Sequence, residues 1–174
     1  MTTVRINISA NDIAPRFRAL GLRFKAAAFR GTMRAAQLAR RTLVKATRTA
    51  RPANPSGIGR GGAVNNGEYL AAWTVQRTEY GARVYNAAKY ASIIEYGRRP
   101  GKMPPSRLLI PWVMRKLHVP AKKAAGIAFV IARAIGRRGL IGRNVMGGSL
   151  SEIELNFYAE VQKELERELT RAGK

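Results

Sequence analysis

Residues 67–97 constrain the fold most, because their pattern changes from strand to helix within one short stretch. Trp73 and Val75 alternate with polar residues, and Val84 resumes the alternation past a turn, which predicts a β-hairpin. A short helix is expected next, since four residues at i, i+3, i+4 and i+7 share one helical face. These residues are Tyr90, Ile93, Ile94 and Gly97. Gly97 suits the left-handed residue that ends a helix, so the stretch predicts a packing core that presents a rigid loop.

The regions on either side of this stretch predict one more strand and several helices. Residues 4–8 alternate apolar and polar side chains, as in a half-buried strand. Helix N-caps are expected at residues 9–12, and an alanine- and arginine-rich run then predicts a long helix to about Thr49. Gly21 and Gly31 weaken this helix and mark expected bends. Shorter helices are expected after Pro111 and Pro120.

Together these patterns predict an α+β fold. We expect a small antiparallel sheet packed against a long N-terminal helix and several shorter helices, with a C-terminal helix. Residues 1–150 are expected to form one domain that contains a glycine-rich, mobile loop at residues 51–67. Residues 151–174 are expected to form an acidic helical extension, opened by the capping box of Ser151 and Glu154.

Charge is distributed very unevenly along the chain. The net charge is +22, and six of the ten acidic residues but only four of the 32 Lys and Arg residues follow residue 151. Residues 1–151 therefore carry +24 and the C-terminal piece carries −2. A field of this strength predicts a polyanionic neighbour. Nucleic acid and an acidic protein ring both fit this description.

The composition argues against catalytic, cofactor and metal sites. The chain has no cysteine and a single histidine, His118, so thiolate chemistry and a site with several imidazole ligands are excluded. Glu95 is the only acid between Gly81 and Ser151 and therefore lacks the second titrating partner that acid–base catalysis normally uses. The glycines of residues 57–62 follow prolines instead of a strand, so they do not form a dinucleotide-binding turn. We expect a protein that is not an enzyme.

Membrane attachment is not expected either. The longest uncharged apolar run in the alanine-rich part, residues 124–132, is too short to cross a bilayer. The first residues also lack the charged-then-apolar pattern of a signal peptide. These features predict a soluble intracellular product.

A series of residues in and after the central stretch resembles a known family. The series is Leu70-x-x-Trp73, Val84-Tyr85-Asn86, Tyr90-Ala91-x-x-Ile94-Glu95-x-Gly97-x-x-Pro100, Pro104-Pro105, Trp112-Val113 with Lys116, and Ala134-Ile135-x-x-Arg138-Gly139. In this order it resembles the neck and tail-completion proteins of tailed bacteriophages, the head–tail joining proteins akin to minor tail protein Z of lambda. The likeness covers residues 65–143, and residues beyond 150 do not map onto it. The family commonly has a small residue where this chain has Arg98.

The resemblance implies a structural virion protein that forms a ring in the neck or tail-completion layer and joins head to tail around the DNA channel. Its expected partners are other copies of itself in a cyclic hexamer, head-closure or adaptor proteins, and tail-tube or tail-terminator proteins. Nonspecific contact with phage DNA is also expected. The location would be the virion, at the neck, after assembly in the host cytoplasm. The alternative function is a free-standing basic protein that binds nucleic acid without sequence preference.

Two groups of residues are predicted to carry these roles. Core anchors are Trp73, Tyr90, Ile94 and Trp112. Residues predicted at an interface or at the DNA channel are Arg34, Arg41, Arg48, Glu95, Arg98, Arg99, Arg137, Arg138, Phe157, Val161 and Leu165. The resemblance gives Glu95 a structural role, paired with Arg98, with Arg99 or with a neighbouring subunit.

The C-terminal helix has two possible partners. Its apolar stripe includes Phe157, Val161 and Leu165 and is too hydrophobic to remain in water. The stripe could fold back on the basic helix of its own chain, or it could pack against an adjacent subunit. In the second arrangement these three residues would supply most of the affinity, and the charged rim would set the register.

Overall fold

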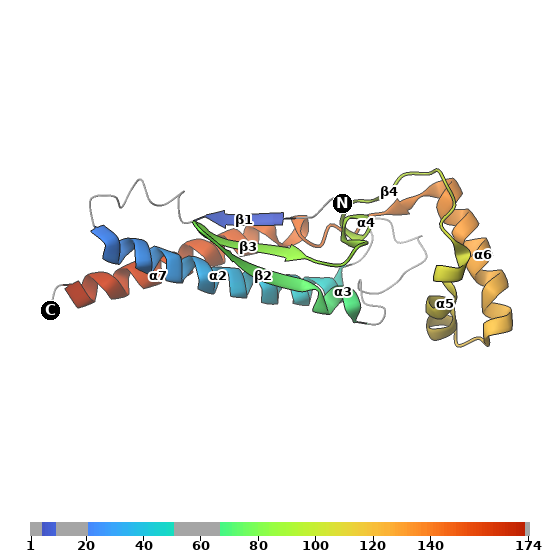
Figure 1. Cartoon of the computed structure of the whole chain (residues 1–174), viewed down its shortest axis with the longest axis horizontal. Coiled ribbons are helices and arrows are strands. Elements are labelled where there is room, and N and C mark those ends of the chain that lie inside the picture. Colours follow the sequence, from blue (N-terminus) through green and yellow to red (C-terminus); the bar gives the residue numbers. More distant parts are fainter. Residues whose placement is uncertain (1–4, 10–20, 51–66, 173–174) are drawn as a thin grey trace.

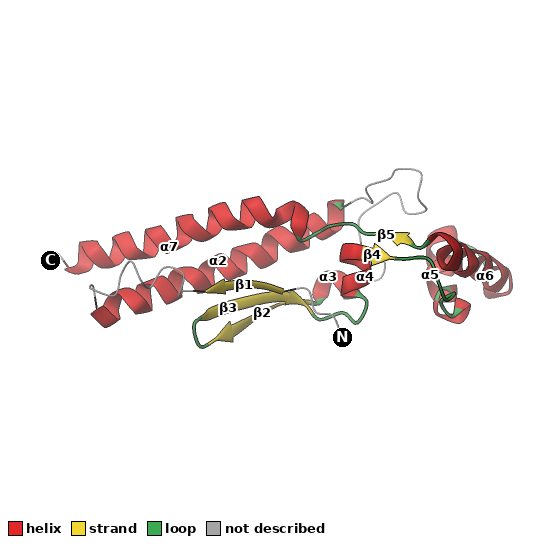
Figure 2. Cartoon of the chain, turned by 90° about the horizontal axis from the view of Figure 1, so that it is seen from above, coloured by secondary structure: helices red, strands yellow, loops and turns green. Residues whose placement is uncertain are grey.

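The computed structural model describes residues 5–9, 21–50 and 67–172, which form an elongated body with a helical arm at one end (Figure 1). The body has three layers. Helix α2 lies in the middle, helix α7 covers one of its sides, and a small sheet covers another (Figure 2). The expected helix caps at residues 9–12 and the expected mobile loop at 51–67 lie almost entirely outside the described residues.

Helix α2 (Gly21–Thr49) is the centre of the body. Its buried face consists largely of alanine, with Phe24 and Leu43 as the large side chains. Small side chains on this face let neighbouring layers approach closely, while alanine also favours the helical backbone. The helix runs without interruption through Gly31, so this glycine does not break it.

The main sheet contains three antiparallel strands in the order β1-β3-β2. They are β1 (Arg5–Ser9), β2 (Trp73–Thr78) and β3 (Gly81–Asn86). The hairpin places Val75 opposite Val84, and Ile6 of β1 also pairs with Val84. Short helix α3 (Glu68–Ala71) leads into this hairpin. The predicted α+β fold, with a small antiparallel sheet against a long helix, is confirmed.

The main core lies between α2 and the sheet. Trp73 is 2% exposed, and its indole Nε1 donates a hydrogen bond to Thr47 Oγ1 at 2.9 Å. The ring of Tyr69 meets the indole edge to face, with centroids 5.9 Å apart, a favoured aromatic geometry. The only polar atom of the indole is thus satisfied inside the core, which lets a large side chain be buried without a desolvation penalty.

Helix α7 (Leu150–Ala172) runs antiparallel to α2. Phe24, Ala27 and Ala28 of α2 pack against Val161 and Leu165 of α7. Ile153, near the start of α7, belongs to the main core. The first of the two arrangements considered for the C-terminal helix is therefore the one observed, and the helix shares a core with the rest of the body.

The arm is a helical hairpin that projects from the body (Figure 1). It contains the 3-10 helix η3 (Ser106–Leu108), α5 (Ile110–Leu117) and α6 (Ala121–Arg138). Short helix α4 (Ala91–Tyr96) precedes it, and a ribbon of two-residue strands, β4 (Gly97–Arg98) and β5 (Leu140–Ile141), forms its base. The arm has its own small cluster around Val113, Ala124 and Ala128.

The segment after the arm returns to the body through the 3-10 helix η4 (Gly147–Ser149). Its glycine-rich sequence alone predicts a mobile segment over residues 140–149, with Leu140, Ile141, Val145 and Met146 exposed. Val145 and Met146 instead lie in the main core, 2% and 6% exposed. Backbone bonds from Arg143 N to Ile94 O and from Asn144 N to Glu95 O, 2.7 and 3.1 Å long, attach the segment to α4. Leu140 and Ile141 are exposed, as predicted.

Replacing Gly31 by alanine tests how closely α2 and α7 approach. The added methyl group would lie 2.7 Å from Val161 Cα and 3.0 Å from the Glu160 carbonyl oxygen. Both are backbone atoms, so the two helices must move apart to admit it. We expect the free energy of unfolding to fall by about 1–3 kcal/mol, as for overpacked cores. Urea denaturation measures this change.

Gly126→Ala in α6 is the matched control, because an added methyl group there meets no atom within 4 Å. Alanine is the better helix former, so this variant should gain up to about 1 kcal/mol. If Gly31→Ala were stabilised to the same extent as Gly126→Ala, the close packing of the two helices would be contradicted.

Candidate interaction surface

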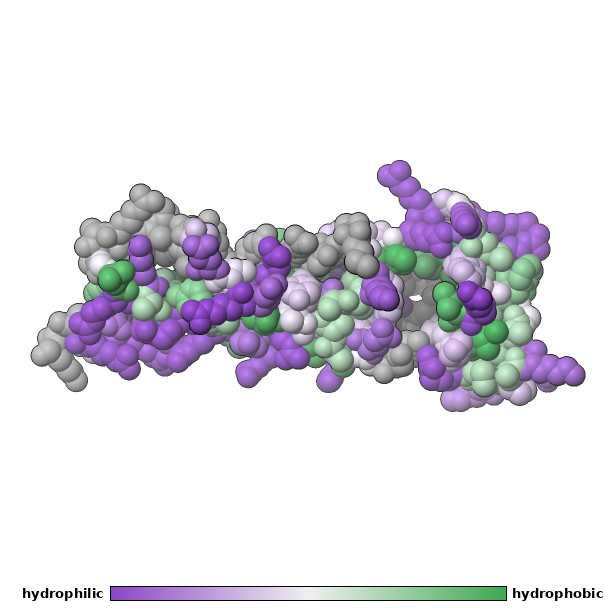
Figure 3. Space-filling model, viewed as in Figure 1, coloured by the Kyte–Doolittle hydropathy of each residue, from purple (hydrophilic) through white to green (hydrophobic). Residues whose placement is uncertain are grey.

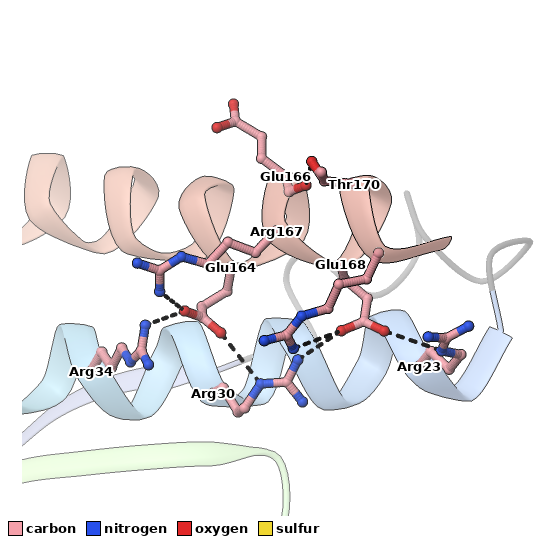
Figure 4. A network of polar contacts seen from close by, with 9 residues as sticks. Arg23, Arg30, Arg34, Glu164, Glu166, Arg167, Glu168 and Thr170 are labelled. Carbon is pink, nitrogen blue, oxygen red and sulfur yellow. Dashed lines mark hydrogen bonds and ion pairs between the residues drawn. The ribbon is translucent and has the colours of Figure 1, made fainter. Parts of the chain in front are cut away.

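Two buried glutamates join α7 to α2 through a cluster of arginines, here called the clamp (Figure 4). Glu164 accepts hydrogen bonds from Arg30 Nε at 3.3 Å, from Arg167 Nη1 at 2.6 Å, and from Arg34. Glu168 accepts from Arg23 Nε at 3.1 Å and from Arg30 Nη2 at 3.0 Å. The clamp consists of Arg23, Arg30, Arg34, Glu164, Arg167, Glu168 and Arg171.

The surroundings of Glu164 favour its charged form. Its side chain is only 5% exposed, whereas those of Arg30, Arg34 and Arg167 are 44–51% exposed. Burial acts to raise the pKa of Glu164, but the hydrogen bonds from Arg167 and Arg30 and the charge of Arg34 outweigh burial. The net result is a lowered pKa. The clamp therefore stabilises the ionised carboxylate and ties the helix pair together.

The clamp gives Arg34 a different role from the predicted one, which placed it at an interface or at the DNA channel. Its guanidinium is bonded to Glu164 of the same chain, so it stabilises the body. The spacing of charged residues in the sequence contains a signal for this arrangement, which the apolar periodicity of the two helices did not reveal. Arg23, Arg30 and Arg34 are spaced by seven and four residues and therefore share a helical face. Glu164 and Glu168 are likewise four apart.

Glu95 pins the base of the arm. It is 4% exposed, and its carboxylate accepts hydrogen bonds from the backbone N–H groups of Met146 and Gly147 at 3.0 and 3.1 Å. The suggested pairing with Arg98 or Arg99 was wrong, because the backbone of the returning segment satisfies this acid instead. Burial and, second, the charge of Glu95 raise the pKa of Tyr69 far above its ordinary value. Glu95 is a structural acid at the junction of body and arm.

The arm is the most strongly basic part of the described structure. Residues 97–141 contain eleven basic side chains and no acid, namely Arg98, Arg99, Lys102, Arg107, Arg115, Lys116, Lys122, Lys123, Arg133, Arg137 and Arg138. Hydrophobic side chains are exposed among them, with Leu108 at 69% and Val130 at 65%. Figure 3 shows hydrophobic and hydrophilic residues side by side at this end of the molecule. Exposed apolar groups framed by charge are typical of a contact surface.

A second basic surface is the groove between α2 and α3. Its volume is about 420 Å³, and its lining residues are Arg40, Arg41, Val44, Lys45, Arg48, Leu70 and Ala71. Arg41, Lys45 and Arg48 follow one another at i, i+4 and i+7 and are exposed. Arg40 donates from Nε to the Trp73 carbonyl oxygen at 2.8 Å. The groove thus combines an apolar floor with three cations that face solvent.

The other predicted residues divide between core and surface. Tyr90 and Ile94 are half-buried against the main core, and Tyr90 stacks on Tyr69 at 6.2 Å between centroids. Trp112 is half-buried in the separate cluster of the arm. The Arg98 guanidinium donates to the carbonyl oxygen of Lys102. Arg99, Arg137 and Arg138 are exposed on the arm, whereas Phe157, Val161 and Leu165 face α2.

The described ranges offer neither a metal site nor a membrane-spanning helix. Among residues 5–9, 21–50 and 67–172, no three His, Cys, Asp or Glu side chains lie close enough to hold a metal ion. No helix in this part of the chain is long and apolar enough to cross a membrane. No protein-family model, curated protein or solved structure matches the chain.

The lowered pKa of Glu164 predicts how stability depends on pH. In the folded state the pKa of this carboxylate lies below its ordinary value of 4.5. The unfolded chain therefore binds more protons near that pH. The contribution of Glu164 is fully present above about pH 4.5 and is lost as the pH falls through the lower, folded-state pKa. We expect urea midpoints measured between pH 7 and pH 3 to decline in this window.

Glu164→Gln should flatten that decline and lower the free energy of unfolding at pH 7 by about 1–3 kcal/mol, as for lost charged hydrogen bonds. Glu166→Gln is the control, since Glu166 is exposed on the same helix. An equal effect of the two substitutions would show that the clamp adds no stability.

Proposed function

We propose that this chain is a structural virion protein of a tailed phage, which forms a ring in the neck or tail-completion layer and joins head to tail around the DNA channel. The observation that carries the proposal is the projecting arm. A body with its own core presents a separate, acid-free helical hairpin at one end. This construction suits a protein whose arm contacts neighbouring subunits or partner proteins in an assembly.

The arm is poorly suited to remain alone in solution. Its core is small, with Val113, Ala124 and Ala128 fully buried, while Leu108, Phe129 and Val130 are about half or more exposed. Eleven like charges on 45 residues repel one another. An acidic or polyanionic neighbour would relieve both the repulsion and the apolar exposure, which favours a role in assembly.

The residues of the family resemblance occupy positions that support the same proposal. Trp73 and Val84 lie in the main core, and Glu95 and Gly97 form the junction between body and arm. The segment after Gly97 is the arm itself, with Trp112 in its own cluster. The resemblance therefore covers both parts and the connection between them.

The groove supports a related second function, which is nucleic-acid binding without sequence preference. Arg41 and Arg48 are seven residues apart on α2, about 10 Å along the helix, and Lys45 lies between them. Three cations on one helical face match a phosphate backbone but carry no base-reading pattern. A ring subunit could turn this groove to the DNA channel, whereas a free-standing protein would use it alone.

The neck role predicts that the chain is a minor component of finished virions. Mass spectrometry of purified tailed particles from the producing host should detect it at far fewer copies than the capsid protein. Deletion of its gene should leave filled heads and tails unjoined in electron micrographs, and supply of the chain in trans should restore joining. Normal particles without the chain would contradict the proposal and favour the free-standing alternative.

Charge reversal in the groove tests the contact with DNA. For wild-type protein, log affinity for duplex DNA should fall linearly with log salt, with a slope of about −0.9 for each phosphate neutralised. The double variant R41E/R48E should reduce the magnitude of the slope by about 2. The control K25E/K89E makes the same change in net charge at exposed residues outside the groove. Equal slopes for both variants would show that total charge, and not the groove, binds DNA.

A further inference from the structure

Helix α6 carries a second face that its own hairpin does not cover. Lys122, Gly126, Phe129, Arg133 and Arg137 are spaced by four, three, four and four residues, so they lie along one side of the helix. All are exposed, with Phe129 at 49%. Val130, next to this line, is 65% exposed. We call this side the α6 face: it is an apolar centre flanked by cations.

Helix α7 also has an uncovered face, beside the stripe of residues that packs on α2. Leu155, Tyr158, Gln162, Glu166 and Leu169 follow at spacings of three, four, four and three residues and all are exposed. The three large side chains, Leu155, Tyr158 and Leu169, are 72%, 66% and 53% exposed. We call this side the α7 face.

The charge of the α7 face is opposite to that of the α6 face. Arg167 and Arg171 contact the buried glutamates of the clamp. The α7 face itself carries one charged residue, Glu166, and Glu154 lies at its edge. Glu152 accepts a hydrogen bond from Thr42 of α2, and Glu160 lies beside Val161 on the side that meets Gly31. In contrast, α6 and the whole arm lack acidic residues. The two faces are therefore complementary in sign as well as in apolar content.

The two faces also match in length. Lys122 to Arg137 covers 16 residues of α6 and Leu155 to Leu169 covers 15 residues of α7, about 21–23 Å in each case. Both have aromatic or aliphatic residues within reach of a facing helix. Two helices of this kind can pack along their full length, with their cations and carboxylates at the rim.

The α7 face of the same molecule is out of reach of the α6 face. The ribbon of β4 and β5 holds the hairpin at the end of the body, away from the C-terminal end of α7 (Figures 1 and 2). Glu95 fixes the base of the ribbon through the backbone of residues 146 and 147. A second copy of the chain, in contrast, can present its α7 face without any change in the first.

We infer that the α6 face of one subunit docks on the α7 face of the next. This contact is heterologous, because each copy offers a different surface on its two sides, and repetition of such a contact closes a ring or extends a filament. The inference rests on the proposed function for closure into a ring. The pairing of the two faces follows from their own charge and shape.

Gly126 supports this docking independently. Glycine inside a helix costs about 1 kcal/mol relative to alanine, and a Cβ at Gly126 would meet no atom within 4 Å. Its own chain therefore does not require glycine at this position. A partner helix that packs on the α6 face would gain a close backbone approach there, as α7 does at Gly31.

Two charge-introducing variants test the contact. Phe129→Asp alters the α6 face and Leu155→Asp alters the α7 face, and both residues are exposed, so the thermal unfolding of the free chain should not change. Each variant alone should self-associate at least about 30-fold more weakly than wild type, as for hot-spot residues. Sedimentation measures the association. Gly126→Leu should have the same effect without an added charge.

Mixing the two variants is the decisive experiment. Each keeps one intact face, so an equimolar mixture should form a 1:1 heterodimer and no larger species. Weak contacts can be captured with a short bismaleimide, since the chain has no cysteine of its own. Gly126→Cys protein should cross-link to Tyr158→Cys protein but not to a control with cysteine at exposed Lys89.

Self-association that survives both aspartate substitutions would overturn the inference, and so would a mixture that fails to pair. A wild-type chain that neither self-associates nor cross-links would also overturn it. Each of these results would leave the neck role intact if virions still contain the chain. A chain absent from virions that still pairs through the two faces would refute the neck role alone.

Discussion

The structure depends on how closely α7 lies against α2. Gly31 lets the two backbones meet at Val161, and this approach allows the small residues Ala27 and Ala28 to contact α7 directly. The same approach brings Glu164 and Glu168 within reach of arginines on the opposite helix. Without α7, the exposed side of α2 would present an apolar stripe beside unpaired cations, so the helix pair completes the three-layer body.

The buried carboxylates of the clamp are tolerated because the glutamates lose most of their contact with water while the arginines do not. Glu164 and Glu168 lose nearly all contact with water, whereas the guanidiniums keep about half or more of their exposure. Charged hydrogen bonds from several arginines compensate the two acids. The cations need less compensation because they remain partly hydrated. Two acids thus restrain five arginines, which still leaves the surface of the body positively charged.

Local pattern was enough to predict the elements, but not how they assemble. The hairpin from Trp73 to Asn86 and the long helix to Thr49 follow from periodicity, as does the C-terminal helix. The pairing of Gly97 with Ile141 joins residues 44 positions apart, and no local signal reports it. The burial of Val145 and Met146 was missed for the same reason: the glycines around them indicated a loop, while the core they enter is built from α2 and the sheet.

The ribbon at the base of the arm has a mechanical consequence. Gly97 and Gly139 have positive φ angles, and an added Cβ at either would collide with the opposite strand's backbone. The two segments of the chain that connect body and arm therefore pack against each other with almost no free space. Because α6 is about 27 Å long, a rotation of 5° at this point, to take a round figure, would displace its far end by about 2 Å. The arm can rotate relative to the body only at the ribbon, so the tight packing of the ribbon limits how far the end of the arm can move.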